Sequence, residues 1–187
     1  MLADQNMLDG CKAGNRRAQS QLYRAYASVM LGVCMRYASG LAEAEDMLQE
    51  GFVKIFTNIA SFRGSGSLEG WMRRIIINTA LNHIRNKAKF RAVDYTDDLP
   101  DFQDEDSKEE EPITDVSAAI LLQIIQNLPE GYRMVFNLFA IELNTHKEIA
   151  DMLGISEGTS KSQLSKARRI LKMKLAEVHN NSTLSVH

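Results

Sequence analysis

The chain has 187 residues, a formal net charge of −2, two cysteines and four histidines. Its apolar runs are too short to span a membrane and its first residues lack a signal-peptide pattern, so the sequence predicts a protein of the reducing cytoplasm without membrane insertion. The cysteines form no CxxC pair and the histidines are scattered, which argues against a zinc site. The sequence contains neither a P-loop nor a G-x-S-x-G motif that would suggest catalysis, and nothing in it indicates a cofactor.

Three helices are predicted in the first 91 residues, because strand-like alternation is absent and apolar residues recur every three or four positions. They span about 18–38, 42–56 and 68–87, and Gly40 is expected to end the first. The third helix is apolar over much of its surface, so we expect it to be central and packed on both sides.

The second predicted helix has an acidic face formed by Glu43, Asp46 and Glu50, with Gln49 beside it. A solvated surface is the simplest interpretation. A docking surface for a basic partner and a divalent-metal site are the alternatives, although no residue elsewhere clearly completes a metal site.

The third predicted helix carries a polar arc of Arg74, Asn78, Asn82 and Arg85. Arginine and asparagine are side chains that contact phosphates and base edges in protein–DNA complexes. Nucleic-acid contact and a plain polar stripe on a packed helix therefore both stay open.

An acidic segment divides the chain. Residues 1–91 contain 13 Lys and Arg against 7 Asp and Glu, residues 92–117 contain 1 against 11, and residues 118–187 contain 8 against 6. Because the middle segment lacks periodicity and is too charged to bury a core, we predict a disordered linker between two small all-α domains. The second domain spans 118–178, with helices near 117–128 and 129–139, and a polar, frayed tail at 179–187 is expected.

The stretch 144–175 predicts a helix-turn-helix. Thr145 and Glu148 have the spacing of a capping box, Gly154 stands where the chain reverses, and Ser156 can cap the next helix. The second helix is cationic on one side and apolar on the other, which suits a DNA groove, whereas two surface helices with a solvated basic face are the alternative. Its cations are Lys161, Lys166, Arg168, Arg169, Lys172 and Lys174.

Four segments in fixed order resemble an extracytoplasmic-function (ECF) RNA polymerase sigma factor. They are AEAEDMLQEGFVKIF, WMRRIIINTALNHIRNK, LPEGYRMVFNLF and KEIADMLGISEGTSKSQLSKARRILK, and the resemblance covers residues 8–177. It implies a non-enzymatic subunit that recruits core RNA polymerase to promoters and opens them. A sequestering anti-sigma factor is common in such a family.

For the first domain, the resemblance implies that Asp46, Gln49 and Glu50 dock on the clamp helices of the largest polymerase subunit. It implies that the loop 61–68 captures a flipped non-template base and that the acidic linker threads the polymerase cleft. The implied contacts to the minus-ten promoter element are Arg74, Asn78, Asn82 and Arg85.

For the second domain, the resemblance implies recognition of the minus-thirty-five element and contact with the flap of the second-largest subunit. Lys161, Ser162 and Ser165 match base-reading positions, whereas Lys166, Arg168 and Arg169 suit phosphates.

Three positions depart from the usual family pattern, which has an apolar residue at 160, arginine at 163 and often glycine at 143. This chain has Ser160, Gln163 and Leu143. Because Ser160 points inward on a helical wheel, we expect a less tightly packed recognition helix. The missing arginine removes a phosphate contact and leaves the minus-thirty-five preference open.

Two other functions are compatible with parts of the sequence. A helix-turn-helix repressor or activator that acts without polymerase would explain 144–175, but it would leave the acidic face and the polar arc without a role. A metal-dependent nuclease would use Glu43, Asp46 and Glu50.

Overall fold

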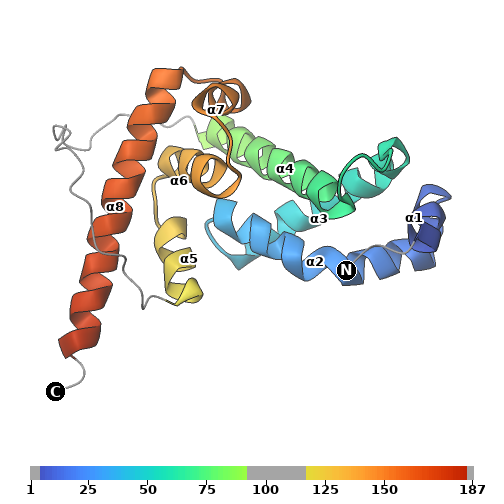
Figure 1. Ribbon diagram of the computed structural model, residues 1–187, viewed down its shortest axis with the longest axis horizontal. Helices are drawn as coiled ribbons and strands as arrows, with labels where there is room; N and C mark the ends of the chain where they lie inside the picture. Colours follow the sequence, from blue (N-terminus) through green and yellow to red (C-terminus); the bar gives the residue numbers. More distant parts are fainter. Residues whose placement is uncertain (1–4, 92–116, 185–187) are drawn as a thin grey trace.

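The computed structural model describes residues 5–91 and 117–184, and every regular element within these ranges is helical (Figure 1). The prediction of an all-α fold is confirmed. The predicted disordered linker falls almost entirely on 92–116, which lies outside the described residues.

The first module contains α1 (Gln5–Lys12), α2 (Arg16–Tyr37), α3 (Leu41–Asn58), a 3₁₀ turn η1 (Ile59–Ser61) and α4 (Leu68–Arg91). Asn15 caps α2, because its Oδ1 accepts from the backbone N–H groups of Arg17 and Ala18 at 2.8 and 3.3 Å. Helix α1 was not predicted, since two buried residues three positions apart, Leu8 and Cys11, give too short a periodic signal. Gly40 does not end α2, which stops at Tyr37; it is instead the residue before α3.

Helix α4 packs on both α2 and α3, as predicted, but α2 and α3 also pack on each other, so α4 is not the single central helix of this module (Figure 1). Met30 of α2, Met47 of α3 and Ile76 of α4 are fully buried in the shared core. Gly51 allows α3 and α4 to approach closely, because a Cβ atom there would overlap the side chain of Ile76. Both cysteines are buried free thiols, as expected.

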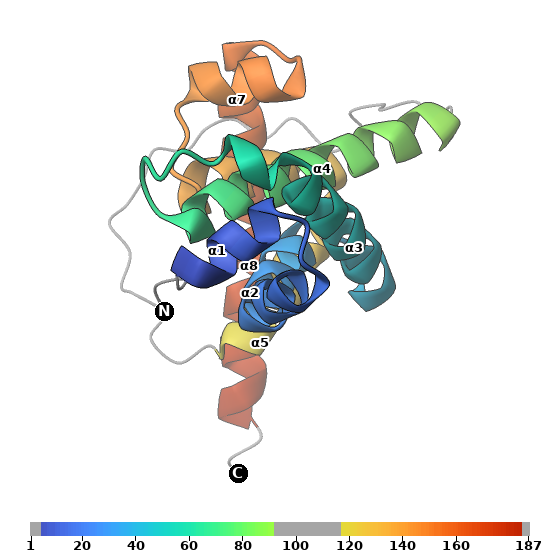
Figure 2. The ribbon, with the colours of Figure 1, turned by 90° about the vertical axis from the view of Figure 1, so that its right-hand side faces the viewer.

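The second module contains α5 (Ala118–Gln126), α6 (Glu130–Phe136), a π-helical turn η2 (Asn137–Ile141), α7 (His146–Leu153) and α8 (Glu157–Leu184). Ser117 caps α5, and its Oγ accepts from the Ile120 N–H at 3.4 Å. The helix predicted at 129–139 is therefore two elements, and the tail predicted to fray at 179 continues as helix to Leu184. The long α8 packs along α6 and α5 (Figures 1 and 2).

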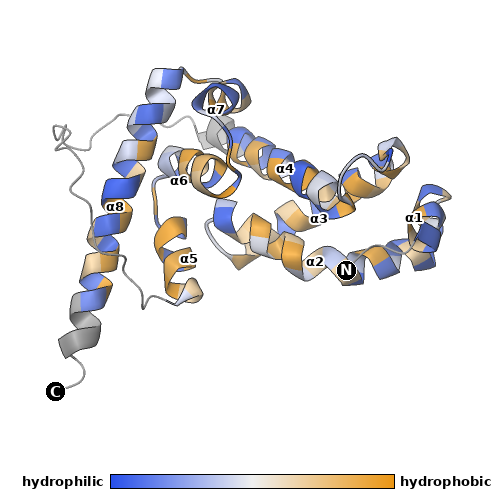
Figure 3. Ribbon diagram, viewed as in Figure 1, coloured by the Kyte–Doolittle hydropathy of each residue, from blue (hydrophilic) through white to orange (hydrophobic). Residues whose placement is uncertain are grey.

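One apolar cluster spans the two modules, and a second lies between α5, α6 and α8. Val135, Leu138 and Ile149 of the second module belong to the same buried cluster as the core of α2, α3 and α4. Two side-chain amides also cross between the modules, from Gln126 Nε2 to the Met35 carbonyl at 2.9 Å and from Asn137 Nδ2 to the Arg36 carbonyl at 2.7 Å. Helix α5 consists mostly of hydrophobic residues, whereas much of α8 is hydrophilic (Figure 3).

Candidate nucleic-acid and partner interfaces

The predicted helix-turn-helix is formed by α7 and α8, and its local signals are confirmed. Thr145 Oγ1 accepts from the Glu148 N–H at 3.3 Å, while Glu148 Oε2 accepts from the Thr145 N–H at 2.8 Å. Glu148 Oε2 also accepts from the Thr145 hydroxyl at 2.8 Å, and the backbone and side-chain bonds that Thr145 donates to this carboxylate lower the pKa of Glu148. Gly154 is left-handed with φ 69°, and Ser156 Oγ accepts from the Thr159 N–H at 2.9 Å.

The N-terminal half of α8 has one buried and one exposed side. Leu164, Ala167 and Leu171 face the core. The candidate DNA contacts Lys161, Ser162, Ser165 and Arg168 are exposed, whereas Lys166 and Arg169 are half-buried. Gln163 is also half-buried and lies against the backbone of Gly131 on α6, so this position does not face open solvent.

Ser160 is completely buried, which confirms its inward orientation. Its hydroxyl is 2.9 Å from His146 Nδ1, so it joins α8 to the first turn of α7 instead of leaving a loose contact. The His146 ring stacks on Phe139 of η2 at 4.6 Å, and the Arg168 guanidinium lies 5.5 Å from the Phe139 ring centre. Ser160 and Arg168 of α8 therefore both contact the stacked pair of His146 and Phe139.

The polar arc of α4 is confirmed as one exposed side of this helix, comprising Arg74, Asn78, Asn82 and Arg85. Its opposite side carries buried Met72, Ile76 and Ala80. Because the core fixes the helix, these four side chains are presented to solvent together.

The glycine-rich loop before α4 is anchored at its start. Phe62 is buried, and its ring lies 5.6 Å from that of Trp71. Gly64 and Gly66 both have positive φ, at 79° and 87°, and Ser67 Oγ accepts from the Gly70 N–H at 3.0 Å to cap α4. The residues between these anchors, 63–67, are exposed.

The acidic residues of α3 do not converge. Asp46, Gln49 and Glu50 are exposed, and Glu50 pairs with Lys54 at 2.6 Å. Glu43 instead accepts from the Ser39 N–H at 2.7 Å and lies 3.8 Å from His83. Within the described parts of the chain, no three His, Cys, Asp or Glu side chains come close enough to hold a metal ion, so the nuclease interpretation has no geometric support there.

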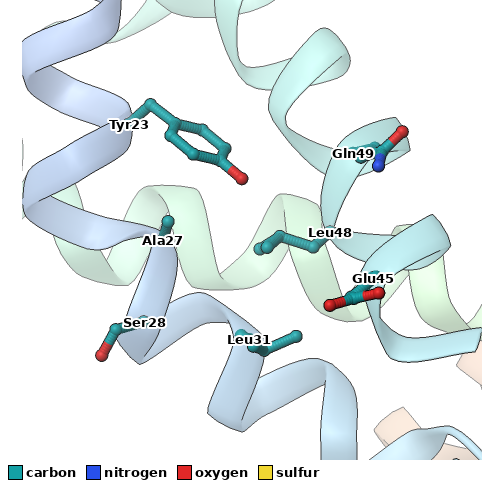
Figure 4. Close-up of a pocket in the computed structure, with 7 residues that line it drawn as sticks. All are labelled: Tyr23, Ala27, Ser28, Leu31, Glu45, Leu48 and Gln49. Carbon is teal, nitrogen blue, oxygen red and sulfur yellow. The ribbon is translucent and has the colours of Figure 1, made fainter. Parts of the chain in front are cut away.

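A pocket of about 330 Å³ lies between α2 and α3 beside these acidic residues (Figure 4). Tyr23, Ala27, Ser28 and Leu31 line one wall, and Glu45, Leu48 and Gln49 line the other. This pocket was not predicted from the sequence, although Tyr23, Ala27 and Leu31 recur every four residues along one side of α2.

Comparison with known proteins shows the family to which both modules belong. The family model for sigma-70 region 2 matches residues 22–90, and that for sigma-70 region 4 matches residues 118–171. The RNA polymerase sigma-H factor of Pseudomonas aeruginosa is 30% identical over 176 residues, covering 90% of this chain and 91% of that protein. The chain belongs to the ECF family of RNA polymerase sigma factors.

The ECF sigma-E factor of Haemophilus influenzae is 28% identical to this sigma factor over 184 residues, covering 93% of this chain and 96% of that protein. The sigma factor RpoE of Bartonella quintana, solved in complex with the anti-sigma factor NepR, shares the fold. Its TM-score is 0.52 at 19% identity, with 84% of this chain and 96% of that chain covered.

The sigma factor directs promoter-specific initiation of transcription, with α2–α4 in region 2 and α5–α8 in region 4. The family assignment takes precedence over the repressor and nuclease interpretations. Among the described helices, none has the length and apolar character needed to cross a membrane.

Proposed function

We propose that this sigma factor binds core RNA polymerase through an acidic docking surface, defined as Asp46, Gln49 and Glu50 on α3. The observation that carries the proposal is the exposure of these three side chains beside the pocket between α2 and α3. A partner such as the clamp helices of the largest subunit would contact both the acidic residues and the pocket. It would gain electrostatic complementarity and bury apolar surface of Tyr23 and Leu31, which line the pocket.

The minus-ten face, defined as Arg74, Asn78, Asn82 and Arg85, is proposed to meet the minus-ten element. All four are exposed on a helix whose other side is core, so binding has to order their side chains but not the helix that carries them. The exposed loop residues 63–67 are proposed to hold a flipped base. Unstacking a base costs a few kcal/mol, which the phosphate and base contacts would offset.

The minus-thirty-five face is proposed to comprise the exposed or half-exposed polar side of α8. Lys161, Ser162 and Ser165 are assigned to base edges, and Lys166, Arg168 and Arg169 to phosphates. The contact between Arg168 and Phe139 would hold that guanidinium in position before DNA arrives.

The functional divisions that we propose are 1–91 for polymerase docking and minus-ten recognition, 92–117 as the linker and 118–178 for minus-thirty-five recognition. The second module would also meet the flap of the second-largest subunit. The protein would act in the cytoplasm without catalysis of its own. The Bartonella relative was solved with an anti-sigma factor, which supports a sequestering partner of the same kind here.

The docking surface is tested by charge reversal. Asp46→Arg and Glu50→Lys should each weaken pull-down of core polymerase roughly tenfold or more, about 1.4 kcal/mol, because each puts a cation opposite a basic partner. Asp9→Arg on α1 is the control, since it makes the same change at an exposed residue away from α3. Circular dichroism checks the fold, and normal pull-down by both α3 variants would refute the assignment.

A further inference from the structure

Glu142 lies in the turn between η2 and α7, and its carboxylate is bound by two arginines of the other module. Arg73 of α4 binds it in a fork, from Nε to Oε2 at 2.7 Å and from Nη2 to Oε1 at 2.7 Å. Arg36 near the end of α2 adds a third bond, from Nη2 to Oε1 at 3.1 Å. The Glu142 side chain is only 9% exposed, so three charges from three segments meet in a largely desolvated place.

Around this ion cluster the contact between the modules is imperfectly satisfied. Four buried side-chain atoms in the described parts of the chain lack a hydrogen-bond partner, and all belong to segments that meet there: Arg36 Nε, Tyr37 Oη, Arg133 Nε and Asn137 Oδ1. Leaving buried polar atoms unpaired is unfavourable, and water would satisfy them if the modules separated. The contact therefore combines the apolar cluster that spans both modules with charged bonds and unpaired polar atoms. The unpaired atoms lower the free-energy cost of separating the modules.

The closed arrangement also limits how far apart the two DNA-binding faces can lie. Arg73 is next to Arg74 and paired with Glu142, which is four residues before His146, and His146 bonds to Ser160 beside Lys161. Summing the reach of these links puts Arg74 and Lys161 within about 50 Å of each other. Arg74 and Lys161 each stand at one end of their face. Adding half the length of each face along its helix gives an upper limit of about 65 Å between the centres of the two faces.

A promoter requires a longer span. The minus-ten and minus-thirty-five elements are centred about 25 base pairs apart, or about 85 Å along B-form DNA. The closed molecule therefore does not reach both elements of one straight promoter. The covalent length of residues 92–116, about 85 Å if fully extended, is enough to let the modules part.

We propose that Glu142 is an intramolecular latch: by occupying Arg36 and Arg73 it holds the two modules closed, and it must leave them before one molecule engages both promoter elements. The effect on promoter binding rests on the proposed DNA-binding faces, whereas the contact of Glu142 with Arg36 and Arg73 does not. The latch residues lie outside the polymerase docking surface.

The latch is tested by measuring the distance between the modules in the free, full-length chain. Spin labels at Val53→Cys on α3 and Met173→Cys on α8 use exposed positions outside the interface, while Cys11 and Cys34 are buried. The wild type should give one short distance population. Glu142→Arg should shift most of it to longer distances, Glu142→Gln should do so partly, and adding Arg73→Glu to Glu142→Arg should move it back.

Glu177→Arg is the matched control, because Glu177 is an exposed carboxylate paired with Lys174 on α8 and its distances should stay at the wild-type value. Circular dichroism and core-polymerase pull-down verify that each variant is folded. An unchanged distance population in folded Glu142→Arg would overturn the latch, as would an equal shift in Glu177→Arg.

The functional consequence is tested separately with free chain and short duplexes at low salt. Glu142→Arg should bind a duplex with both elements several-fold more tightly than Glu177→Arg does, because a larger fraction of its molecules has separated modules that can reach both elements. The two variants should bind a minus-thirty-five duplex alike. If Glu142→Arg lengthens the distance between the labels but does not bind the two-element duplex more tightly, the link between opening and promoter binding is overturned. If every variant binds both duplexes weakly, the proposed DNA-binding faces are wrong instead.

Discussion

Ser160 shows how a single polar residue is accommodated in a helix-turn-helix core. A buried hydroxyl without a partner is unfavourable, and His146 supplies one at 2.9 Å. The histidine is in turn fixed by stacking on Phe139, which also contacts Arg168. The packing of α7 against α8, and so the direction of the proposed minus-thirty-five face, thus depends in part on a polar contact.

Replacing Ser160 by alanine should lower the free energy of unfolding by about 1 kcal/mol, because His146 Nδ1 loses its partner in a half-buried place. Urea denaturation followed by circular dichroism measures this change. Ser162→Ala is the matched control on the same helix, since its exposed hydroxyl bonds only to the Thr159 carbonyl and its loss should stay within about 0.5 kcal/mol. Equal effects of the two substitutions would contradict the role given to Ser160.

At the scale of the elements, the sequence predicted the features that depend on contacts between residues close in the chain. The capping box at Thr145, the left-handed Gly154 and the cap at Ser156 act within three or four residues, and all were predicted. The π-helical η2 was not predicted. Its Asn137 and Leu138 are buried, and Asn137 bonds to the Arg36 carbonyl of the other module, a contact between positions 101 residues apart that no local pattern encodes. The continuation of α8 to Leu184 was missed for lack of apolar periodicity in its last turns.

The candidate site divides in the same way. Exposure of Arg74, Asn78, Asn82 and Arg85 followed from helical periodicity, because the opposite side of α4 is continuously apolar. The partnership of Glu142 with Arg36 and Arg73 joins positions 69 and 106 residues apart, and no local pattern encodes it.

Two glycines near the turn of the helix-turn-helix should respond oppositely to alanine. Gly154→Ala should destabilise the protein by about 1 kcal/mol, because φ 69° is unfavourable for a residue with a Cβ atom. Gly158→Ala should stabilise it by about 0.5 kcal/mol, because this helical site has negative φ and only ordinary contact with Ser156 Oγ at 3.6 Å. Thermal denaturation of both variants tests this, and a stabilising Gly154→Ala would contradict the left-handed turn.

At the scale of the whole molecule, the chain combines two requirements that oppose each other. The apolar cluster that includes Val135, Leu138 and Ile149 makes the two modules one cooperative body. Promoter recognition at two separated elements requires two bodies. An interface in which charged bonds and unpaired polar atoms accompany the apolar cluster satisfies both requirements. It is stable in the free chain, yet it can separate when stronger partners bind each module.

This balance predicts how the free protein unfolds. The wild type should show a single calorimetric transition, because the shared core couples the modules. Glu142→Arg should show two transitions or one markedly broadened transition, since three cations then meet in a place that is largely closed to solvent and the modules no longer stabilise each other. Glu177→Arg should keep the single transition. Two separate transitions in the wild type would mean that the modules unfold independently even with Glu142 in place, and the cooperative coupling inferred from the continuous core would then be wrong.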